Sequence, residues 1–177
     1  LLGTGMRIGE ALGLRWDDCD FENNTISVNH IILYKESEQG GYRYRISEPK
    51  TKAGFRIIPM FQDVKAALLR EKGKKHDSAL KPFGVDGYTN FIFLNSNGKV
   101  YTPGAVFDVI QRITNDYNRE EFFKAAKEHR EPRYLPKMSA HILRHTFCTR
   151  LCENESDIKV VQDVMGHKNS RTTMDVY

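Results

Sequence analysis

The feature that most limits the fold of this chain is a change in hydrophobic spacing between residues 25 and 59. "TISVNHIIL", "YRYRIS" and "FRIIPM" are short runs rich in β-branched or aromatic residues, separated by "EQGG" and "TKAG". Such runs between turn residues are typical of antiparallel strands, and "TKAG" is interpreted as a tight hairpin. The segments on either side repeat their apolar residues at helical spacing. The pattern predicts an α+β fold, mainly helical, with a small antiparallel three-stranded sheet near the N-terminal side.

Helical spacing predicts a short helix from Arg7 to Leu14, ended by the turn-prone "WDDCD". "DVKAALLREKG" predicts a second helix with a glycine stop, and Thr102 followed by Pro103 is a favourable start for a third. "FIFLNSNGK", between these two helices, predicts a short strand and turn. The charged segment "REEFFKAAKEHREPRY" predicts an exposed helix or a loop insertion.

Three more helices are expected toward the C-terminus, because serine is a favourable N-cap residue. Ser139 and Ser156 are the predicted caps of the first two, and Ser170 can cap a last helix that carries Tyr177. Gly166 is the predicted end of the middle helix.

Composition limits the class of protein. The 177 residues suit one domain, and 40% hydrophobic residues can supply a core. The net charge of +4 permits an anionic partner without requiring one. No apolar run approaches the length of a membrane span, so no membrane association is expected. Three cysteines without a secretory signal predict a reducing compartment, and we expect a cytoplasmic protein.

The chain begins and ends inside helical patterns. Leu1 enters an apolar helical pattern with no cap ahead of it, and Tyr177 lies in a pattern typical of an unfinished helix. We therefore expect residues 1–177 to be one domain taken from a longer protein.

The stretch "HILRHTFCTR", residues 141 to 150, permits more than one interpretation. His141, His145, Cys148 and Cys152 are spaced by four, three and four residues, so they share one helix face and suggest a zinc site. Four ligands along one helix cannot surround an ion tetrahedrally, however, and we expect no metal. The alternative is a stripe that faces the core, made of His145, Phe147, Cys148 and Leu151.

His141 and Arg144 lie on a neighbouring face of the same predicted helix. Behind the Ser139 cap they fall in the first turn and a half, where unpaired backbone N–H groups favour a bound anion. Arg7 lies near another helix start, with Glu10 one turn later to hold its guanidinium. Two arginines at two helix starts predict a phosphate clamp.

Four blocks occur in the order "TGMRIGEALGLRWDDCDF", "PKTKAGFRIIPM", "SAHILRHTFCTRL" and "VMGHKNSRTTMDVY". Together they cover nearly the whole chain and resemble the catalytic domain of tyrosine recombinases, the phage lambda integrase family. Within that family they most resemble the integrases of conjugative transposons. The resemblance implies a site-specific recombinase that integrates and excises a mobile element.

Transferred to this sequence, the family's catalytic positions are Arg7, Lys52, His141, Arg144, His167 and the nucleophile Tyr177. Glu10 is a supporting residue. Lys50 competes with Lys52 for the lysine position, because the alignment there depends only on the following Gly54 and Pro59.

The resemblance implies that Tyr177 attacks a DNA phosphate and forms a 3′-phosphotyrosine intermediate. Arg7 and Arg144 would stabilise the charge of the pentacoordinate transition state. A free tyrosine has a pKa of about 10, so His141 is the candidate base. Lys52 would protonate the leaving 5′ oxygen.

His167 would donate a hydrogen bond to a phosphate oxygen. The 5′ hydroxyl of a second DNA strand can then attack the 3′-phosphotyrosine bond, which releases the tyrosine and joins the DNA to a new partner strand. No cofactor is expected, since two arginines can stabilise the transition state without a metal.

The implied partner is double-stranded DNA, with candidate contacts to its backbone from Lys35, Arg43, Arg45, Lys137 and Lys168. A homotetramer on paired DNA sites is expected for the full-length protein. An excisionase or a host DNA-bending protein is a candidate accessory partner. Two alternatives stay open: a catalytically silent DNA-binding regulator derived from an integrase, and a nicking and rejoining enzyme like a type IB topoisomerase.

Overall fold

The computed structural model of the chain describes residues 1–74, 82–155 and 157–167. Its elements in chain order are α1 (Ile8–Gly13), η1 (Trp16–Asp18), β1 (Cys19–Asp20), β2 (Thr25–Val28), β3 (Ile31–Glu36), β4 (Tyr42–Ser47), η2 (Lys52–Gly54), β5 (Arg56–Pro59), α2 (Gln62–Lys72), α3 (Pro103–Lys127), α4 (Ala140–Asn154) and α5 (Ile158–Met165). The predicted α+β class is confirmed. Ser156, Lys168, Ser170 and Tyr177, which carry predictions, lie outside the described residues.

The strands form two small sheets. The expected antiparallel three-stranded sheet is present, but its strands are β1, β2 and β5; "YRYRIS", expected in that sheet, is β4 and pairs with β3 in a separate hairpin. The assignment of "TISVNHIIL" to one strand was therefore wrong: β2 pairs with β5, whereas β3 pairs with β4. "TKAG" is not a hairpin turn either, because the strands that flank it belong to different sheets.

The division between β2 and β3 occurs at a buried polar side chain. His30, only 4% exposed, hydrogen-bonds through Nε2 to the carbonyl oxygen of Gly13 at 2.7 Å. Its Nδ1 contacts the Asn29 side chain, and its ring packs against Tyr88 with centroids 4.7 Å apart. A polar ring held on both nitrogens inside the protein fixes the chain where it changes sheet.

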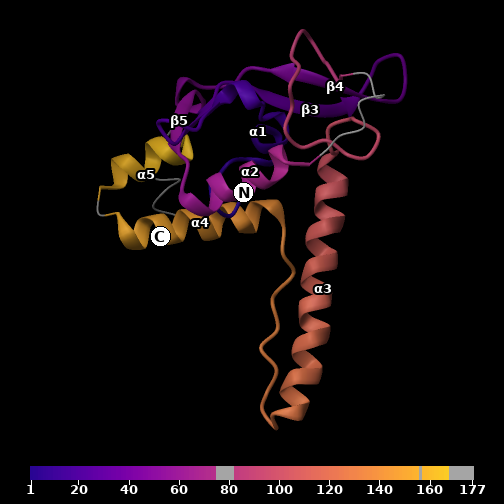
Figure 1. The fold of residues 1–177 in the computed structure, drawn as a ribbon, viewed down its shortest axis with the longest axis vertical. Coiled ribbons are helices and arrows are strands. Elements are labelled where there is room, and N and C mark those ends of the chain that lie inside the picture. The colour runs from indigo at the N-terminus through magenta and orange to yellow at the C-terminus, as the bar shows by residue number, and fades with distance from the viewer. Residues whose placement is uncertain (75–81, 156, 168–177) are drawn as a thin grey trace.

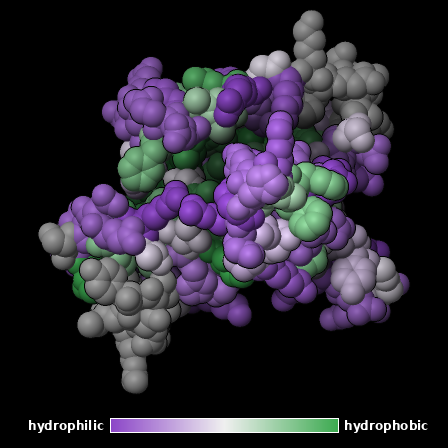
Figure 2. All heavy atoms as spheres, turned by 90° about the horizontal axis from the view of Figure 1, so that it is seen from below, coloured by the Kyte–Doolittle hydropathy of each residue, from purple (hydrophilic) through white to green (hydrophobic). Residues whose placement is uncertain are grey.

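Buried side chains of the three-stranded sheet share an apolar cluster with Ala11 of α1 and Leu68 of α2. Ile26 of β2 and Ile58 of β5 lie opposite each other and are almost fully buried, at 0% and 1% exposure. Together with Leu14 and Leu68 they belong to the largest of three apolar clusters. On the face shown in Figure 2, hydrophilic side chains predominate and hydrophobic ones appear as small patches between them.

The last two helices, α4 and α5, form their own apolar cluster. Ser139 caps α4 as predicted, its Oγ accepting from the N–H of Ile142 at 3.2 Å. The cap of α5 is Asp157 and not the predicted Ser156, and its carboxylate accepts from the N–H of Lys159 at 2.8 Å. α5 ends at Gly166 in the left-handed conformation, with φ of 63°.

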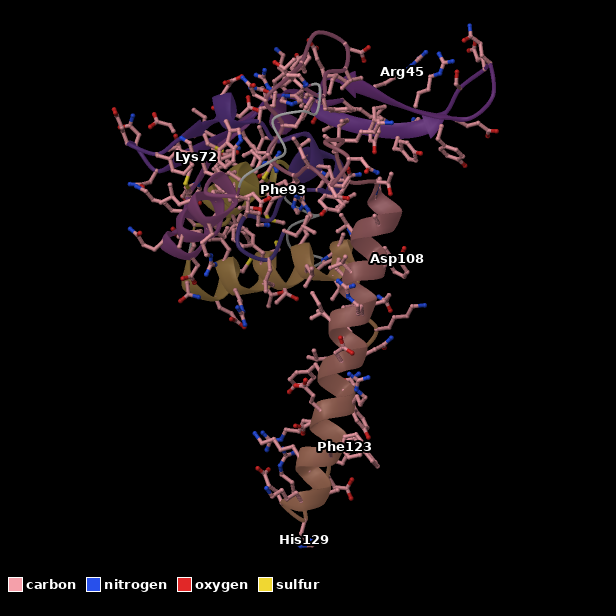
Figure 3. The ribbon with its side chains drawn as sticks, turned by 45° about the vertical axis from the view of Figure 1, so that its right-hand side comes forward. Arg45, Lys72, Phe93, Asp108, Phe123 and His129 are labelled. Atoms are coloured by element: carbon pink, nitrogen blue, oxygen red, sulfur yellow. The ribbon has the colours of Figure 1, made fainter. Side chains whose placement is uncertain are left out.

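Helix α3 projects from the body as an arm (Figure 1). Thr102 caps it as predicted, and one continuous helix of 25 residues includes the first part of "REEFFKAAKEHREPRY". Figure 3 shows His129 at the far tip, from which the chain returns beside the helix. Asn118 holds this return segment by hydrogen bonds with both the N–H and the carbonyl of Leu135, at 2.7 and 2.9 Å. None of the helices within the described ranges is both long and apolar enough to cross a membrane.

Replacing Ile58 with alanine should lower the free energy of unfolding by about 2–5 kcal/mol, because it leaves a cavity in the apolar cluster that Ile58 shares with Leu14 and Leu68. The neighbouring Ile57 is 67% exposed and is the matched control, so Ile57→Ala should change stability by less than about 0.5 kcal/mol. Urea unfolding followed by circular dichroism measures both. Equal effects of the two substitutions would contradict this packing.

Candidate active site

The site begins where Arg7 enters α1. The backbone N–H of Arg7 donates to Glu10 Oε2 at 2.8 Å, and its Nη1 donates to Glu10 Oε1 at 2.9 Å. Glu10 is 3% exposed, whereas the side chain of Arg7 is 47% exposed. The carboxylate thus fixes both the start of the helix and a guanidinium that still reaches solvent.

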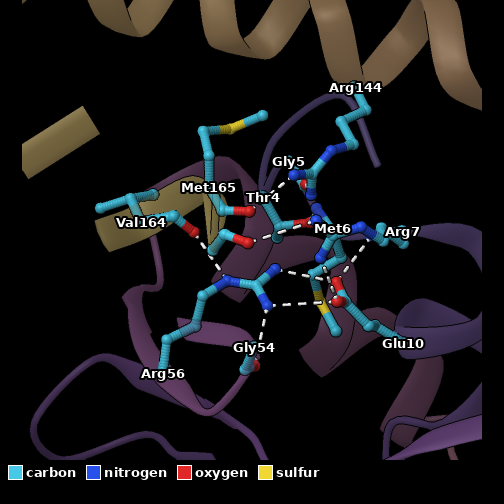
Figure 4. A network of polar contacts seen from close by, with 11 residues as sticks. Thr4, Gly5, Met6, Arg7, Glu10, Gly54, Arg56, Arg144, Val164 and Met165 are labelled. Carbon is cyan, nitrogen blue, oxygen red and sulfur yellow. Dashed lines mark hydrogen bonds and ion pairs between the residues drawn. The ribbon is translucent and has the colours of Figure 1, made fainter. Parts of the chain in front are cut away.

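A second arginine, Arg56 of β5, meets the same carboxylate. Its Nη2 donates to Glu10 Oε2 at 2.8 Å and its Nη1 to Oε1 at 3.2 Å (Figure 4). Burial alone would raise the pKa of Glu10, but the hydrogen bonds and charge of Arg56, together with Arg7, hold the pKa below its usual value. Glu10 is therefore an ionised, buried carboxylate between two cations.

The third arginine, Arg144, enters from α4. It is 5% exposed and donates to the carbonyl oxygen of Gly5 and, at 2.6 Å, to that of Met165. Burial and the neighbouring charge of Arg7 lower the pKa of Arg144 to about 10. It stays protonated at neutral pH despite its burial.

The three guanidiniums meet at the C-terminal end of α5, on three successive carbonyl oxygens. Arg56 Nε donates to Val164 at 2.8 Å, Arg144 Nη2 to Met165 at 2.6 Å, and Arg7 Nη2 to Gly166 at 3.2 Å. The last carbonyls of a helix lack intrahelical partners and carry its partial negative charge. Figure 4 shows the three arginines converging there from different parts of the fold. The structure thus brings together Arg7 and Arg144, the predicted clamp, and adds Arg56, which no sequence pattern marked as a site residue.

The two histidines of α4 contact each other. His141 is exposed, and its Nε2 lies 2.7 Å from Nε2 of His145, one helical turn later. One ring must donate and the other accept, so each fixes the tautomer of the other. Burial, followed by the charges of His141 and Arg144, lowers the pKa of His145.

The predicted core stripe of α4 is only partly correct. Phe147, Cys148 and Cys152 pack with α5, and Leu151 is partly buried beside them, but His145 lies half-buried at the edge. All three cysteines are free. Within residues 1–74, 82–155 and 157–167, no three His, Cys, Asp or Glu side chains are grouped so that they can hold a metal ion.

His167 follows the carbonyls held by the arginines and is 9% exposed. Its backbone N–H donates to the carbonyl of Gln162 at 3.1 Å, and its own carbonyl accepts from Gln162 Nε2 at 3.0 Å. Burial, then the charges of Arg144 and Arg7, lower the pKa of His167 to about 4. At neutral pH its imidazole is uncharged.

A cavity of about 340 Å³ lies beside Arg7. Its lining residues are Arg7, Glu10, Ile31, Pro49, Lys50, Thr51, Gly54 and Gly166. Lys50 belongs to this lining and Lys52 does not; Lys52 begins the 3-10 turn η2 and is exposed. Two larger hollows, of about 390 and 540 Å³, have mainly apolar linings without any predicted site residue.

Three of the predicted DNA contacts lie on the β3–β4 hairpin, and Lys168 lies outside the described residues. Lys35 pairs with Arg43 across the β3–β4 hairpin, and Arg45, labelled in Figure 3, lies two residues farther along β4. All three are exposed, as is Lys137 in the return segment before α4. A spread of exposed cations over two elements suits contacts with an extended polyanion.

Comparison with known proteins gives the family. The model of the phage integrase family matches residues 1–177. The chain belongs to the phage integrase family. It is 34% identical over 180 residues to the transposase from transposon Tn916 of Enterococcus faecalis, covering 100% of this chain and 40% of the relative. It is 30% identical to a XerC-like tyrosine recombinase of Caldanaerobacter subterraneus, covering 99% of this chain and 42% of the relative.

Solved structures of family members agree in fold. The Tn1549 transposon integrase in complex with a circular intermediate DNA has 40% identity and a TM-score of 0.83, covering 100% of this chain and 51% of that one. The XerA recombinase, at 21% identity and a TM-score of 0.60, supports the fold alone. The chain therefore spans about half the length of the relatives it matches. The resemblance to integrases of conjugative transposons is confirmed.

The low pKa of His167 predicts a titration near pH 4 in NMR spectra of the DNA-free protein. Since the folded pKa lies below the ordinary value of 6.5, the unfolded chain binds more protons between these pH values. The contribution of His167 to stability, on the order of 3 kcal/mol at most, is thus complete above pH 6.5 and lost as the pH falls toward 4.

His167→Gln should remove this part of the pH dependence and also identify the NMR signal. A His167 midpoint near 6.5 in the DNA-free protein would contradict the burial of this ring among cations.

Proposed function

We propose that this chain is the catalytic domain of a site-specific DNA recombinase, an integrase that cleaves and rejoins DNA through a 3′-phosphotyrosine link with Tyr177. It would integrate and excise a mobile element. The observation that carries the proposal is the convergence of Arg7 and Arg144 on the C-terminal end of α5, next to His167, in a chain of the phage integrase family. The Tn916 and Tn1549 relatives are transposon proteins, which supports a mobile element as the substrate.

The arginines retain donors for a phosphate. Among the described residues, the guanidinium of Arg7 bonds Glu10 and Gly166, and that of Arg144 bonds Gly5 and Met165. Each uses two of the five N–H groups that a guanidinium carries. The remaining N–H groups of Arg7, whose side chain is 47% exposed, and those of Arg144 that reach the surface can bind the non-bridging oxygens of a phosphate and stabilise the added charge of the transition state.

Proton transfer needs a base and an acid. His141 is exposed and has its tautomer set by His145, so it suits the removal of the Tyr177 proton. His167, uncharged at neutral pH, can donate a hydrogen bond to a phosphate oxygen. The acid for the leaving 5′ oxygen is Lys52 or Lys50, and the cavity favours Lys50 by its position beside Arg7.

We further propose double-stranded DNA as the partner, bound in part through Lys35, Arg43, Arg45, Lys137 and Lys168. The structure of the related Tn1549 integrase is a complex with a circular intermediate DNA, which supports this partner. In a longer protein we propose a homotetramer on paired DNA sites, with an excisionase or a DNA-bending protein as an accessory factor. The reaction would take place on bacterial DNA in the cytoplasm.

The first test uses the natural protein with nicked fragments of its source genome in EDTA, followed by denaturation. The protein should retain covalently attached DNA, because two arginines can stabilise the transition state without a metal. Tyr177→Phe should abolish the adduct, since only the phenolic oxygen is lost.

DNA that binds before denaturation but forms no adduct would favour a silent DNA-binding regulator. Supercoil relaxation without joint molecules would favour the topoisomerase-like alternative. Sequencing the captured DNA gives the target junction for later experiments.

The choice between Lys50 and Lys52 can be tested with a junction duplex whose leaving 5′ oxygen is replaced by sulfur. A thiolate leaves without a proton, because its conjugate acid is far stronger than an alcohol. Alanine at the true general acid should slow cleavage of the ordinary duplex by about 10²–10⁴-fold and leave the sulfur substrate nearly unaffected. We expect this for Lys50→Ala, with Lys52→Ala, two positions later, as the matched control. Rescue of Lys52→Ala instead would reverse the assignment.

A further inference from the structure

Arg56 has no step in the proposed reaction, yet its charge is deeply buried. Its side chain is 4% exposed and makes bonds to Glu10, Val164 and Gly54. Burying a charge removes its hydration at a large cost in free energy, so the retention of this charge calls for a physical reason. Glu10, which it shares with Arg7, suggests that reason.

Arg56 takes the larger share of the Glu10 carboxylate. It binds both carboxylate oxygens with two N–H groups, at 2.8 and 3.2 Å. The guanidinium of Arg7 makes one bond to the same carboxylate, at 2.9 Å, and its second bond goes to Gly166. The single negative charge of Glu10 thus compensates two positive charges. Most of that compensation goes to Arg56, so the positive charge of Arg7 is only partly compensated.

Without Arg56 the balance would change. Glu10 Oε2 would keep only its bond from the Arg7 backbone N–H, which leaves it able to accept a second N–H from the Arg7 guanidinium, and an arginine and a carboxylate prefer a bidentate pair. Such a pair would neutralise Arg7 and draw its guanidinium toward the protein, away from any bound phosphate.

We propose that Arg56 is a positioning residue: it occupies Glu10 so that Arg7 stays a cation available to the scissile phosphate. The inference rests on the proposed recombinase function. The bond from Arg56 Nε to Val164 adds to this effect, because it holds the end of α5 and with it Gly166, the other partner of Arg7.

A merely structural role and a positioning role predict opposite results for a double substitution. Removing Arg56 alone leaves Glu10 as an excess buried carboxylate. Replacing Glu10 by glutamine as well removes the charge that would capture Arg7. At a temperature where both variants are fully folded, a purely structural role of Arg56 predicts no recovery of cleavage from the second change.

The experiment measures the rate of adduct formation by the natural protein on a nicked duplex of the junction sequence. Arg56→Met should slow it about 10²-fold, as expected for a lost transition-state contact of Arg7. Glu10→Gln/Arg56→Met should be about tenfold faster than Arg56→Met. In a Tyr177→Phe background, the DNA dissociation constant of Arg56→Met should stay within about threefold, since most backbone contacts lie elsewhere. Arg70→Met, on the exposed side of α2, is the matched control and should keep the normal rate.

Several outcomes overturn the inference. A normal rate in Arg56→Met does so, as does a double variant that folds but is no faster than Arg56→Met. If Arg56→Met does not fold, Arg56→Lys replaces it, and its retained charge should keep the rate within about tenfold of normal. A rate as low as that of Arg7→Ala would then refute the charge argument. Absence of any adduct with the unsubstituted protein would instead refute the proposed function, and this inference with it.

Discussion

The contact on which the rest of the site depends is the set of bonds from three arginines to the C-terminal end of α5. The arginines are Arg56 of β5, Arg144 of α4 and Arg7, which lies just before α1. For Arg56 and Arg7, the carbonyl that accepts the bond is more than a hundred residues away in the chain. The α4–α5 unit has its own apolar cluster, so these bonds help fix it against the sheet. Gly166 is required there, because a Cβ at this position would lie 2.8 Å from the carbonyl oxygen of Ala53.

This arrangement leaves an excess of positive charge. Three guanidiniums face one carboxylate, Glu10, and the remaining compensation comes from carbonyl dipoles. The lowered pKa values of Arg144 and His167 are consequences of burial in this surrounding. The carbonyl dipoles at the helix end cannot fully neutralise the positive charge of the three arginines. A site with net positive charge and little solvent therefore favours the binding of an anion.

The sequence predicts those parts of the structure that depend on near neighbours. The caps at Ser139 and Thr102, the glycine end of α5 and the contact from Arg7 to Glu10 involve residues within a few positions of each other. The error at Ser156 has the same origin, because the adjacent Asp157 is an equally good cap.

The parts that could not be predicted depend on distant partners. Nothing near Arg56 in "FRIIPM" marks it as buried, since its partners Glu10 and Val164 are 46 and 108 residues away. Likewise, the break between β2 and β3 depends on a bond from His30 to Gly13, and an alternating strand pattern does not reveal which sheet a strand joins.

The arm shows how a polar side chain can stabilise a projecting element. Glu121 is 7% exposed and binds Arg130 Nη1 at 2.5 Å, while it also accepts from the N–H of Arg133 at 2.8 Å. The carboxylate therefore holds the return segment close to the turn at the tip. Because that segment leads directly to Ser139, the cap of α4, the same carboxylate constrains the path of the chain into the helix that carries His141 and Arg144. The bonds of Arg144 to Gly5 and Met165 then fix the other side of this helix, so the candidate base is positioned from two directions.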